Sequence, residues 1–301
     1  MSLITVFTPT FNRAHLLPQL YASLCEQTLK NFTWLIIDDG STDDTFNLVK
    51  KWKTESKINI DYHSQENQGM VAAHNTAHHL MNTPLCVCID SDDYMPLDAI
   101  EKISILWHKY GSDNCAGLIG LDQYPNGEIV GDKFPNDNWN CKFSDLEANA
   151  IYGDKKFVHN RSVFNKYLPY PKFEGEKFPI TSFLYFYIEQ DHRYLAFNEV
   201  LCVVEYQEDG LSNNLINQYK QSPKSFAHYR KTRMKFALNF KMKFKNAIHY
   251  VSSMLMARNY RLFKENPAKL TTFFAIPFGV LLKLYLTATK KTSINTKLNK
   301  K

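Results

Sequence analysis

The sequence predicts an α/β fold, in which a mixed, mostly parallel sheet is flanked by helices and followed by a basic helical C-terminal region. Short apolar runs alternate with segments of helical periodicity as far as residue 110. Polar motifs follow the first, second and fourth apolar runs, at the strand ends where parallel sheets bind ligands. The charge also divides the chain, because residues 1–215 carry a net charge of −12 and residues 216–301 one of +18.

Strands are expected where a short apolar run is bounded by turn residues, and helices where apolar residues recur at a spacing near 3.6. These patterns predict four strands, at 3–8, 32–37, 58–63 and 85–89, and four helices, near 16–24, 46–52, 70–81 and 99–110. Beyond residue 110 the pattern is less regular. We expect strands at 116–121 and 200–206, a helix or strand at 183–188, helices in 216–263 and a frayed basic tail after the apolar stretch 270–288.

The composition describes a globular protein of a reducing compartment. The 301 residues are 44% hydrophobic, which excludes disordered and collagen-like chains and allows one or two real cores. None of the six cysteines has zinc-ligand spacing with histidine, and we expect buried free thiols. The N-terminus starts a strand and lacks the basic and apolar regions of a signal peptide, so we expect a cytoplasmic location.

Paired carboxylates at the end of the fourth apolar run are the first candidate site. Asp90, Ser91 and Asp92, with Asp93 behind them, follow the run LCVCI. Crowded carboxylates repel one another unless a cation compensates them, and Mg²⁺ or Mn²⁺ bound to diphosphate oxygens would do so. The alternative is a solvated acidic loop that caps the next helix. Its position at the end of a strand favours a metal and phosphate site.

Three further motifs lie at comparable positions. Asp38, Asp39 and Gly40 follow the second strand, where a carboxylate can accept a hydrogen bond from a base or ribose, although turn and N-cap chemistry is the alternative. The segment TPTFNR, residues 8–13, offers donors suited to phosphate or nucleotide groups. The segment NQGMVAAHN, residues 67–75, combines a glycine turn with a helix start that can face a nucleotide.

The ordered set TPTFNR, IIDDGSTDDT, NQG with HN, and CIDSDD resembles the family 2 inverting glycosyltransferases with a GT-A fold, of the bacterial polysaccharide type. The resemblance covers roughly residues 3–110, with weaker echoes to about 215. It implies a Rossmann-like sheet that binds a nucleotide-sugar donor, usually linked to UDP, together with Mn²⁺ or Mg²⁺. It also implies that residues 1–215 form the catalytic domain and that residues 216–301 contact the membrane or the acceptor.

The resemblance assigns expected roles to individual residues. Thr8 and Asp39 would contact the base, Asp90 and Ser91 the ribose and diphosphate, and Asp92 the metal, with Asp90 as a second ligand. The expected donor-binding set also includes Pro9, Asn12, Arg13, Asn67 and Gly69.

Two departures from the family pattern concern the phosphate and the acceptor. His74 stands where the family often has arginine, so a phosphate-contacting cation is missing or replaced by a titrating group. The family's acidic acceptor motif matches FEGEKFPIT, with Thr181 where a further acid is expected. That leaves Glu176, and after it Glu174, as the expected general base, with surface acids as the alternative. The segment 205–212 also resembles these enzymes and offers Glu208, Asp209 or Ser212 to the diphosphate.

The basic C-terminal region points to an anionic partner. Its 19 Lys and Arg residues with interleaved aromatic residues suit an anionic membrane surface, and we expect no nucleic-acid partner. The alternatives are helices packed on the domain with a solvated lysine face, or a membrane-spanning helix at 270–288.

The expected function is metal-dependent transfer of a sugar to a glycan or lipid-linked acceptor of surface polysaccharide, such as capsule or lipopolysaccharide, at the inner face of the cell membrane. The rival functions are a non-catalytic nucleotide-sugar-binding module and a nucleotidyltransferase. The latter would need a glycine-rich phosphate loop, which TPTFNRAH is not.

Overall fold

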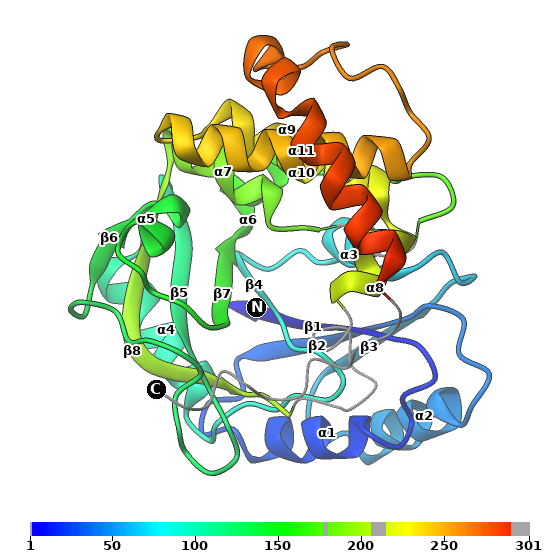
Figure 1. Ribbon diagram of the computed structural model, residues 1–301. Coiled ribbons are helices and arrows are strands. Elements are labelled where there is room, and N and C mark those ends of the chain that lie inside the picture. Colours follow the sequence, from blue (N-terminus) through cyan, green and yellow to red (C-terminus); the bar gives the residue numbers. More distant parts are fainter. Residues whose placement is uncertain (1, 177–179, 206–214, 290–301) are drawn as a thin grey trace. The chain divides into compact units, whose positions relative to one another are not determined.

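The computed structural model describes residues 2–176, 180–205 and 215–289, and the chain divides into two compact units (Figure 1). The first unit comprises Met1–Tyr170 and Tyr187–Glu205, and the second comprises Pro171–Phe186 and Tyr206–Lys301. We expected residues 1–215 to form the catalytic domain. The segment Pro171–Phe186 belongs instead to the second unit.

A mixed sheet forms the centre of the first unit, as the sequence predicts (Figure 1). Within the described residues it has eight strands in the order β3-β2-β1-β4-β7-β5-β8-β6. The pairs β1–β2, β1–β4, β2–β3 and β5–β8 are parallel, whereas β7 and β6 run antiparallel to their neighbours. The strands are β1 Ile4–Thr10, β2 Phe32–Asp38, β3 Ile60–Ser64, β4 Leu85–Cys88, β5 Cys115–Gln123, β6 Trp139–Cys141, β7 Lys155–Asn160 and β8 Arg193–Val203.

Helices cover both faces of the parallel strands, because alternate strand residues point to opposite faces. Val6 packs in one apolar cluster with residues of α1, α2 and α4, whereas its neighbour Phe7 packs in another cluster with residues of α3. Cys86 and Cys88 also share the α3 side, and all six cysteines are free thiols. The helices of this part are α1 Leu17–Glu26, α2 Thr45–Glu55, α3 Met70–Leu80, α4 Ala99–Tyr110, α5 Phe143–Ala148 and α6 Arg161–Phe164.

The less regular part of the sequence is also ordered as strands and helices. The strand expected at 116–121 lies within β5, and the ambiguous segment 183–188 is helical, in α7 Phe183–Asp191. The strand expected at 200–206 falls on the last residues of the longer β8, which ends at Val203 and in which Asn198 and Glu199 interrupt the apolar residues.

The second unit is helical, as expected for the basic C-terminal region. Its helices are α8 Leu215–Gln221, α9 Pro223–Lys235, α10 Phe240–Met256 and α11 Lys269–Ala288. The helices α9, α10 and α11 share an apolar cluster that includes Met234, Val251 and Ala275. α11 is the one helix of the described chain that is long and apolar enough to cross a membrane. The basic tail expected after it lies outside the described residues from 290 onwards.

Candidate functional site

The four predicted motifs meet at one edge of the sheet, where β1, β2 and β4 end. Thr10 at the end of β1 is in register with Asp38 at the end of β2, and the Asp39 N–H donates to the Thr10 carbonyl at 2.8 Å. The Ile89 N–H donates to the Phe7 carbonyl at 3.0 Å, which brings the end of β4 beside β1. Parallel sheets place their binding loops at this edge.

Thr8 connects the segment TPTFNR to the loop of Asp90, Ser91, Asp92 and Asp93, which we name the acidic loop. Its side chain is fully buried, and its hydroxyl donates to the carbonyl of Ile89 at 2.8 Å, immediately before Asp90. The same hydroxyl accepts a hydrogen bond from Trp34 Nε1 at 3.0 Å, which anchors it in the core. The buried hydroxyl of Thr8 therefore ties the end of β1 to the residue that precedes Asp90.

Asn12 connects the segment TPTFNR to the loop that follows β2. Its backbone N–H donates to Ser41 Oγ at 2.9 Å, and its Oδ1 accepts from the Thr42 N–H at 2.7 Å. Asn12 has a φ of 54°, a left-handed conformation that asparagine tolerates better than most residues. Pro9 and Arg13, the other predicted residues of this loop, are half-buried.

Asp39 connects the loop that follows β2 to the segment NQGMVAAHN before and within α3. Its carboxylate, only 4% exposed, accepts hydrogen bonds from Gln65 Nε2 at 2.7 Å and from the backbone N–H groups of Gln68 at 3.0 Å and Gly69 at 2.7 Å. A carboxylate has about four acceptor positions, so this one retains room for one more donor. Gly40, with a φ of 85°, permits the approach, because a Cβ there would lie 2.9 Å from the Asn67 nitrogen.

The acidic loop carries more negative charge than its surroundings compensate. Asp90 is exposed, Ser91 is buried and Asp92 is half-buried. Burial and the nearby Asp90 raise the pKa of Asp92, while the charge of Arg13 partly opposes this rise. Burial raises the pKa of Asp93 to about 7. Raised carboxyl pKa values indicate that a further cation would be bound favourably here.

A buried lysine supports the acidic loop from the neighbouring strand. Lys156 Nζ on β7 lies 3.9 Å from Asp93, and the two side chains are 12% and 10% exposed. Burial alone would lower the pKa of Lys156, but Cys202, Asp122 and Asp93 raise it well above its ordinary value. The side chain of Asp122, on β5, is buried with one carboxylate oxygen unpartnered, and burial raises its pKa to about 6.

Sequence reasoning missed this buried cluster of Asp93, Asp122 and Lys156. The one signal is the pair Lys155–Lys156 at the start of the strand KKFVHN. Neighbouring strand residues point to opposite faces, so only one of them can face the acids. Lys155 instead donates to backbone carbonyls, among them that of Tyr152 at 2.9 Å.

The donor set suits one kind of divalent-ion site and excludes another. Among residues 2–176, 180–205 and 215–289, no group of three or more His, Cys, Asp or Glu side chains is placed to hold a metal ion. Mg²⁺ in nucleotide sites is usually held by one or two carboxylates together with phosphate oxygens. Asp92 and Asp90 therefore fit an ion shared with a diphosphate, and they do not fit a cage made by the protein alone.

His74 does not replace the arginine that the family often has. Its ring contacts Phe7 and Tyr170 edge-on, at centroid distances of 5.2 and 6.0 Å. Burial lowers the pKa of His74 to about 4, although Asp90 opposes this shift. The imidazole is therefore neutral near pH 7 and supplies no positive charge to a phosphate.

The two predicted base candidates lie in the second unit. The Glu176 carboxylate accepts backbone hydrogen bonds from Lys224 at 2.7 Å and Ser225 at 2.8 Å, at the start of α9. Burial raises the pKa of Glu176. Glu174 is exposed, and its carbonyl accepts from Lys224 Nζ at 2.7 Å. Glu208, Asp209 and Ser212 lie outside the described residues.

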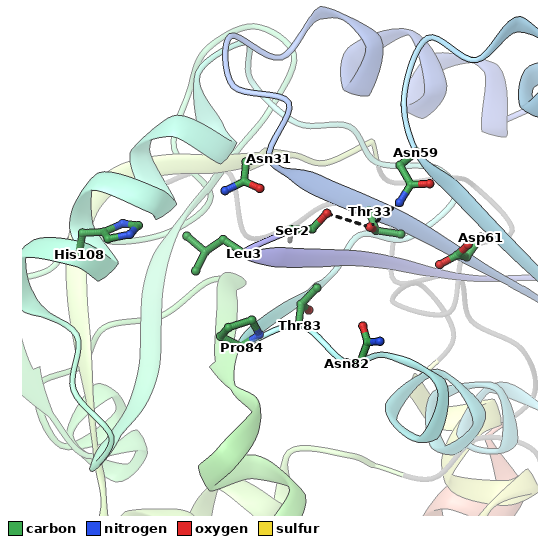
Figure 2. Close-up of a pocket in the computed structure, with 10 residues that line it drawn as sticks. All are labelled: Ser2, Leu3, Asn31, Thr33, Asn59, Asp61, Asn82, Thr83, Pro84 and His108. Atoms are coloured by element: carbon green, nitrogen blue, oxygen red, sulfur yellow. Dashed lines mark hydrogen bonds between the residues drawn. The ribbon is translucent and has the colours of Figure 1, made fainter.

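A hollow of about 630 Å³ lies at the opposite edge of the sheet, where the parallel strands begin (Figure 2). Figure 2 shows polar side chains around it, including Asn31, Asn59 and Asp61, and a hydrogen bond of 3.1 Å between Ser2 Oγ and Thr33 Oγ1. None of the predicted site residues lines it. Its position at the amino ends of the strands separates it from the four motifs.

Known proteins share both the sequence pattern and the fold. Glycosyltransferase GlyA of Streptococcus pneumoniae serotype 4 is 33% identical over 38% of this chain and 16% of its own length. A chondroitin synthase of Escherichia coli is 31% identical over 46% of this chain and 19% of its own length. The alignments thus span less than a fifth of either relative.

A solved structure shows a similar fold over almost the whole chain. The crystal structure of S. aureus TarS matches 96% of this chain and 90% of its own, with a TM-score of 0.61 and 16% sequence identity. TarS in complex with UDP-GlcNAc matches with a TM-score of 0.59 at 14% identity, over 96% of this chain and 91% of its own. At such identities the likeness concerns the fold alone.

The family model of glycosyl transferase family 2 matches residues 5–168, more than half of the chain. The matched segment contains all four motifs at the carboxyl edge of the sheet, and it ends before the two base candidates. The chain belongs to glycosyl transferase family 2.

Proposed function

We propose that this protein transfers one sugar from a nucleotide-linked donor to a glycan or lipid-linked glycan acceptor in the synthesis of a surface polysaccharide, such as capsule or lipopolysaccharide. The observation that carries this proposal is the meeting of the four motifs at the edge where β1, β2 and β4 end. Thr8, Asn12 and Asp39 join them through hydrogen bonds of 2.7–3.0 Å.

UDP is the proposed nucleotide. Asp39 keeps an acceptor position, which suits recognition of a base that presents an N–H group, and Thr8 is proposed to lie beside the base at the end of β1. The TarS structure with UDP-GlcNAc has a similar fold, and the relatives include a chondroitin synthase, so a hexosyl or N-acetylhexosaminyl donor is the one to test first.

Asp90, Ser91 and Asp92 would receive the ribose and diphosphate. Asp92 and Asp90 would hold Mn²⁺ or Mg²⁺, which when bound neutralises the charge of the departing nucleoside diphosphate. Arg13 and Lys156 partly compensate the negative charge of the loop's carboxylates. Pro9, Asn67 and Gly69 shape the backbone around the nucleotide.

Removal of the acceptor's proton is the role proposed for Glu176, or failing it for Glu174. Single-displacement transfer needs a carboxylate that accepts the hydroxyl proton. The raised pKa of Glu176 suits a base that must hold that proton, and its two hydrogen bonds to the start of α9 leave acceptor positions.

The remaining proposals concern location. The C-terminal region would contact an anionic membrane surface, which places the enzyme at the inner face of the cell membrane, where lipid-linked acceptors reside. Its excess of Lys and Arg supports this assignment.

A screen of nucleotide sugars by thermal shift, with and without Mn²⁺, tests the function. We expect UDP-linked sugars to raise the melting temperature by several degrees with Mn²⁺ present, because a ligand at 100 times its Kd adds about 2.7 kcal/mol. EDTA should abolish the shift, and release of UDP should follow with the stabilising donor. The proposal fails if no nucleotide sugar shifts the transition, and a shift without turnover would make the protein a binding module.

A further inference from the structure

α11 has one face packed against α10. Thr272, Ala275, Gly279 and Leu286 are buried, at a spacing that places them along one side of the helix. A Cβ at Gly279 would lie 2.5 Å from the side chain of Val251, so the two helix backbones approach closely there. This side of α11 is therefore occupied within the second unit.

The remaining surface of α11 is apolar and exposed. Only 22% of the residues in the most apolar 18-residue stretch of this helix are buried. Leu270, Phe274 and Leu281 are 72%, 59% and 64% exposed. The other exposed apolar side chains of this helix are Phe273, Phe278, Val280, Leu284 and Tyr285. A contiguous apolar surface of this kind on a soluble protein marks an interaction site.

The apolar surface continues onto α10. Phe244 contacts Phe278 edge-on at a centroid distance of 5.8 Å, and Phe240 stacks on Phe244 at 5.9 Å. The side chain of Phe240 is itself 70% exposed. The exposed side of α11 and the start of α10 thus form one surface, which we name the aromatic face.

Exposed basic residues lie on the same helices and on the loop between them. They are Lys241 at the start of α10, Arg258, Arg261 and Lys264 in the loop before α11, and Lys269 at the first position of α11. Residues 216–301 contain a single acid, Glu265, which lies 3.5 Å from Lys231. An apolar helix face with cationic residues on the same helices complements an anionic lipid surface, where acyl chains receive the aromatic residues and headgroups receive the lysines.

We propose that the aromatic face inserts into an anionic lipid bilayer with α11 lying in the plane of the interface. This inference rests on the membrane contact proposed above, and it adds which face of the second unit makes the contact and how α11 is oriented there. A spanning α11 would have to leave α10 and expose Val251 and its neighbours, whereas in-plane insertion keeps that packing. A second copy of the chain is a poorer occupant, because two regions with the same large excess of positive charge would face each other.

Vesicle flotation with the full-length protein tests the inference. We expect binding to phosphatidylcholine vesicles that contain phosphatidylglycerol, weaker binding to phosphatidylcholine alone, and release by high salt or alkaline carbonate. The double variant Phe274→Asp with Leu281→Asp should bind more than about tenfold more weakly, because two inserted side chains are lost. Both positions are exposed, so the fold should tolerate the change.

Ile105→Asp is the matched control, since Ile105 is 58% exposed on α4 of the first unit and should leave vesicle binding unchanged. Four results would overturn the inference: no binding to anionic vesicles, equal binding by the double variant, binding that resists carbonate, or a dimer in solution that the double variant dissociates. The assay needs no donor, so a failure here leaves the donor screen unaffected, and a failure of the screen leaves vesicle binding unaffected.

Discussion

Replacing Asp92 with asparagine is expected to lower donor hydrolysis and sugar transfer by about two to three orders of magnitude, because the proposed ion at the diphosphate loses its main charged ligand. We expect the free energy of unfolding to be unchanged or slightly higher. Asp92 is a half-buried carboxylate whose pKa is raised by burial and by Asp90, so neutralising it relieves repulsion. The measurement is UDP release from the stabilising donor, with Mn²⁺, beside a urea unfolding curve.

Asp61→Asn is the control for this variant. Asp61 is an exposed carboxylate of β3 that lines the hollow at the amino ends of the strands (Figure 2). The same chemical change there should leave turnover unchanged. Full activity of Asp92→Asn, or an equal loss in both variants, would contradict the role assigned to the acidic loop.

Replacing Lys156 with methionine is expected to lower the free energy of unfolding of the first unit by about 3 kcal/mol. The ammonium group lies 3.9 Å from Asp93, and both side chains are nearly buried. Removing one partner of a buried ion pair leaves the other without compensation, at a cost of about 3–5 kcal/mol. Asp122 would lose the same counter-charge. Urea unfolding followed by tryptophan fluorescence reports on this unit, since it contains all four tryptophans, Trp34, Trp52, Trp107 and Trp139.

Two further variants separate the charge effect from general damage. Lys133→Met removes an exposed lysine of the same unit and should change stability by less than about 0.5 kcal/mol. Adding Asp93→Asn to Lys156→Met should restore part of the loss, because the uncompensated charge is then smaller. If Lys156→Met is as stable as Lys133→Met, the buried cluster does not stabilise the acidic loop as described.

The alternating part of the fold was predictable because local signals and tertiary structure agree there. The runs LITVFT, FTWLII and LCVCI are buried on both faces and form β1, β2 and β4. The second half was harder. In β8 the polar pair Asn198 and Glu199 interrupts the apolar pattern, and the segment 183–188 has apolar residues that suit either a strand or a helix. Assignment of Pro171–Phe186 to the second unit depends on contacts far along the chain, such as Ile180 with Ser225.

The motifs of the candidate site were also visible in the sequence, but their contacts were not. Asp39 was expected to face a ligand, and the structure shows that it holds the 65–69 turn as well. Lys156 lies on an antiparallel strand about 60 residues beyond the acidic loop, and no spacing rule connects the two. The neutral state of His74 follows from burial, which a sequence pattern does not reveal.

The most direct test of the central claim is a crystal structure of the protein with UDP and Mn²⁺, with the metal located by its anomalous signal. We expect a manganese peak beside Asp92 and the diphosphate, with the uracil ring near Thr8 and Asp39. A nucleotide bound in the hollow at the amino ends of the strands, or a metal remote from Asp92, would contradict it.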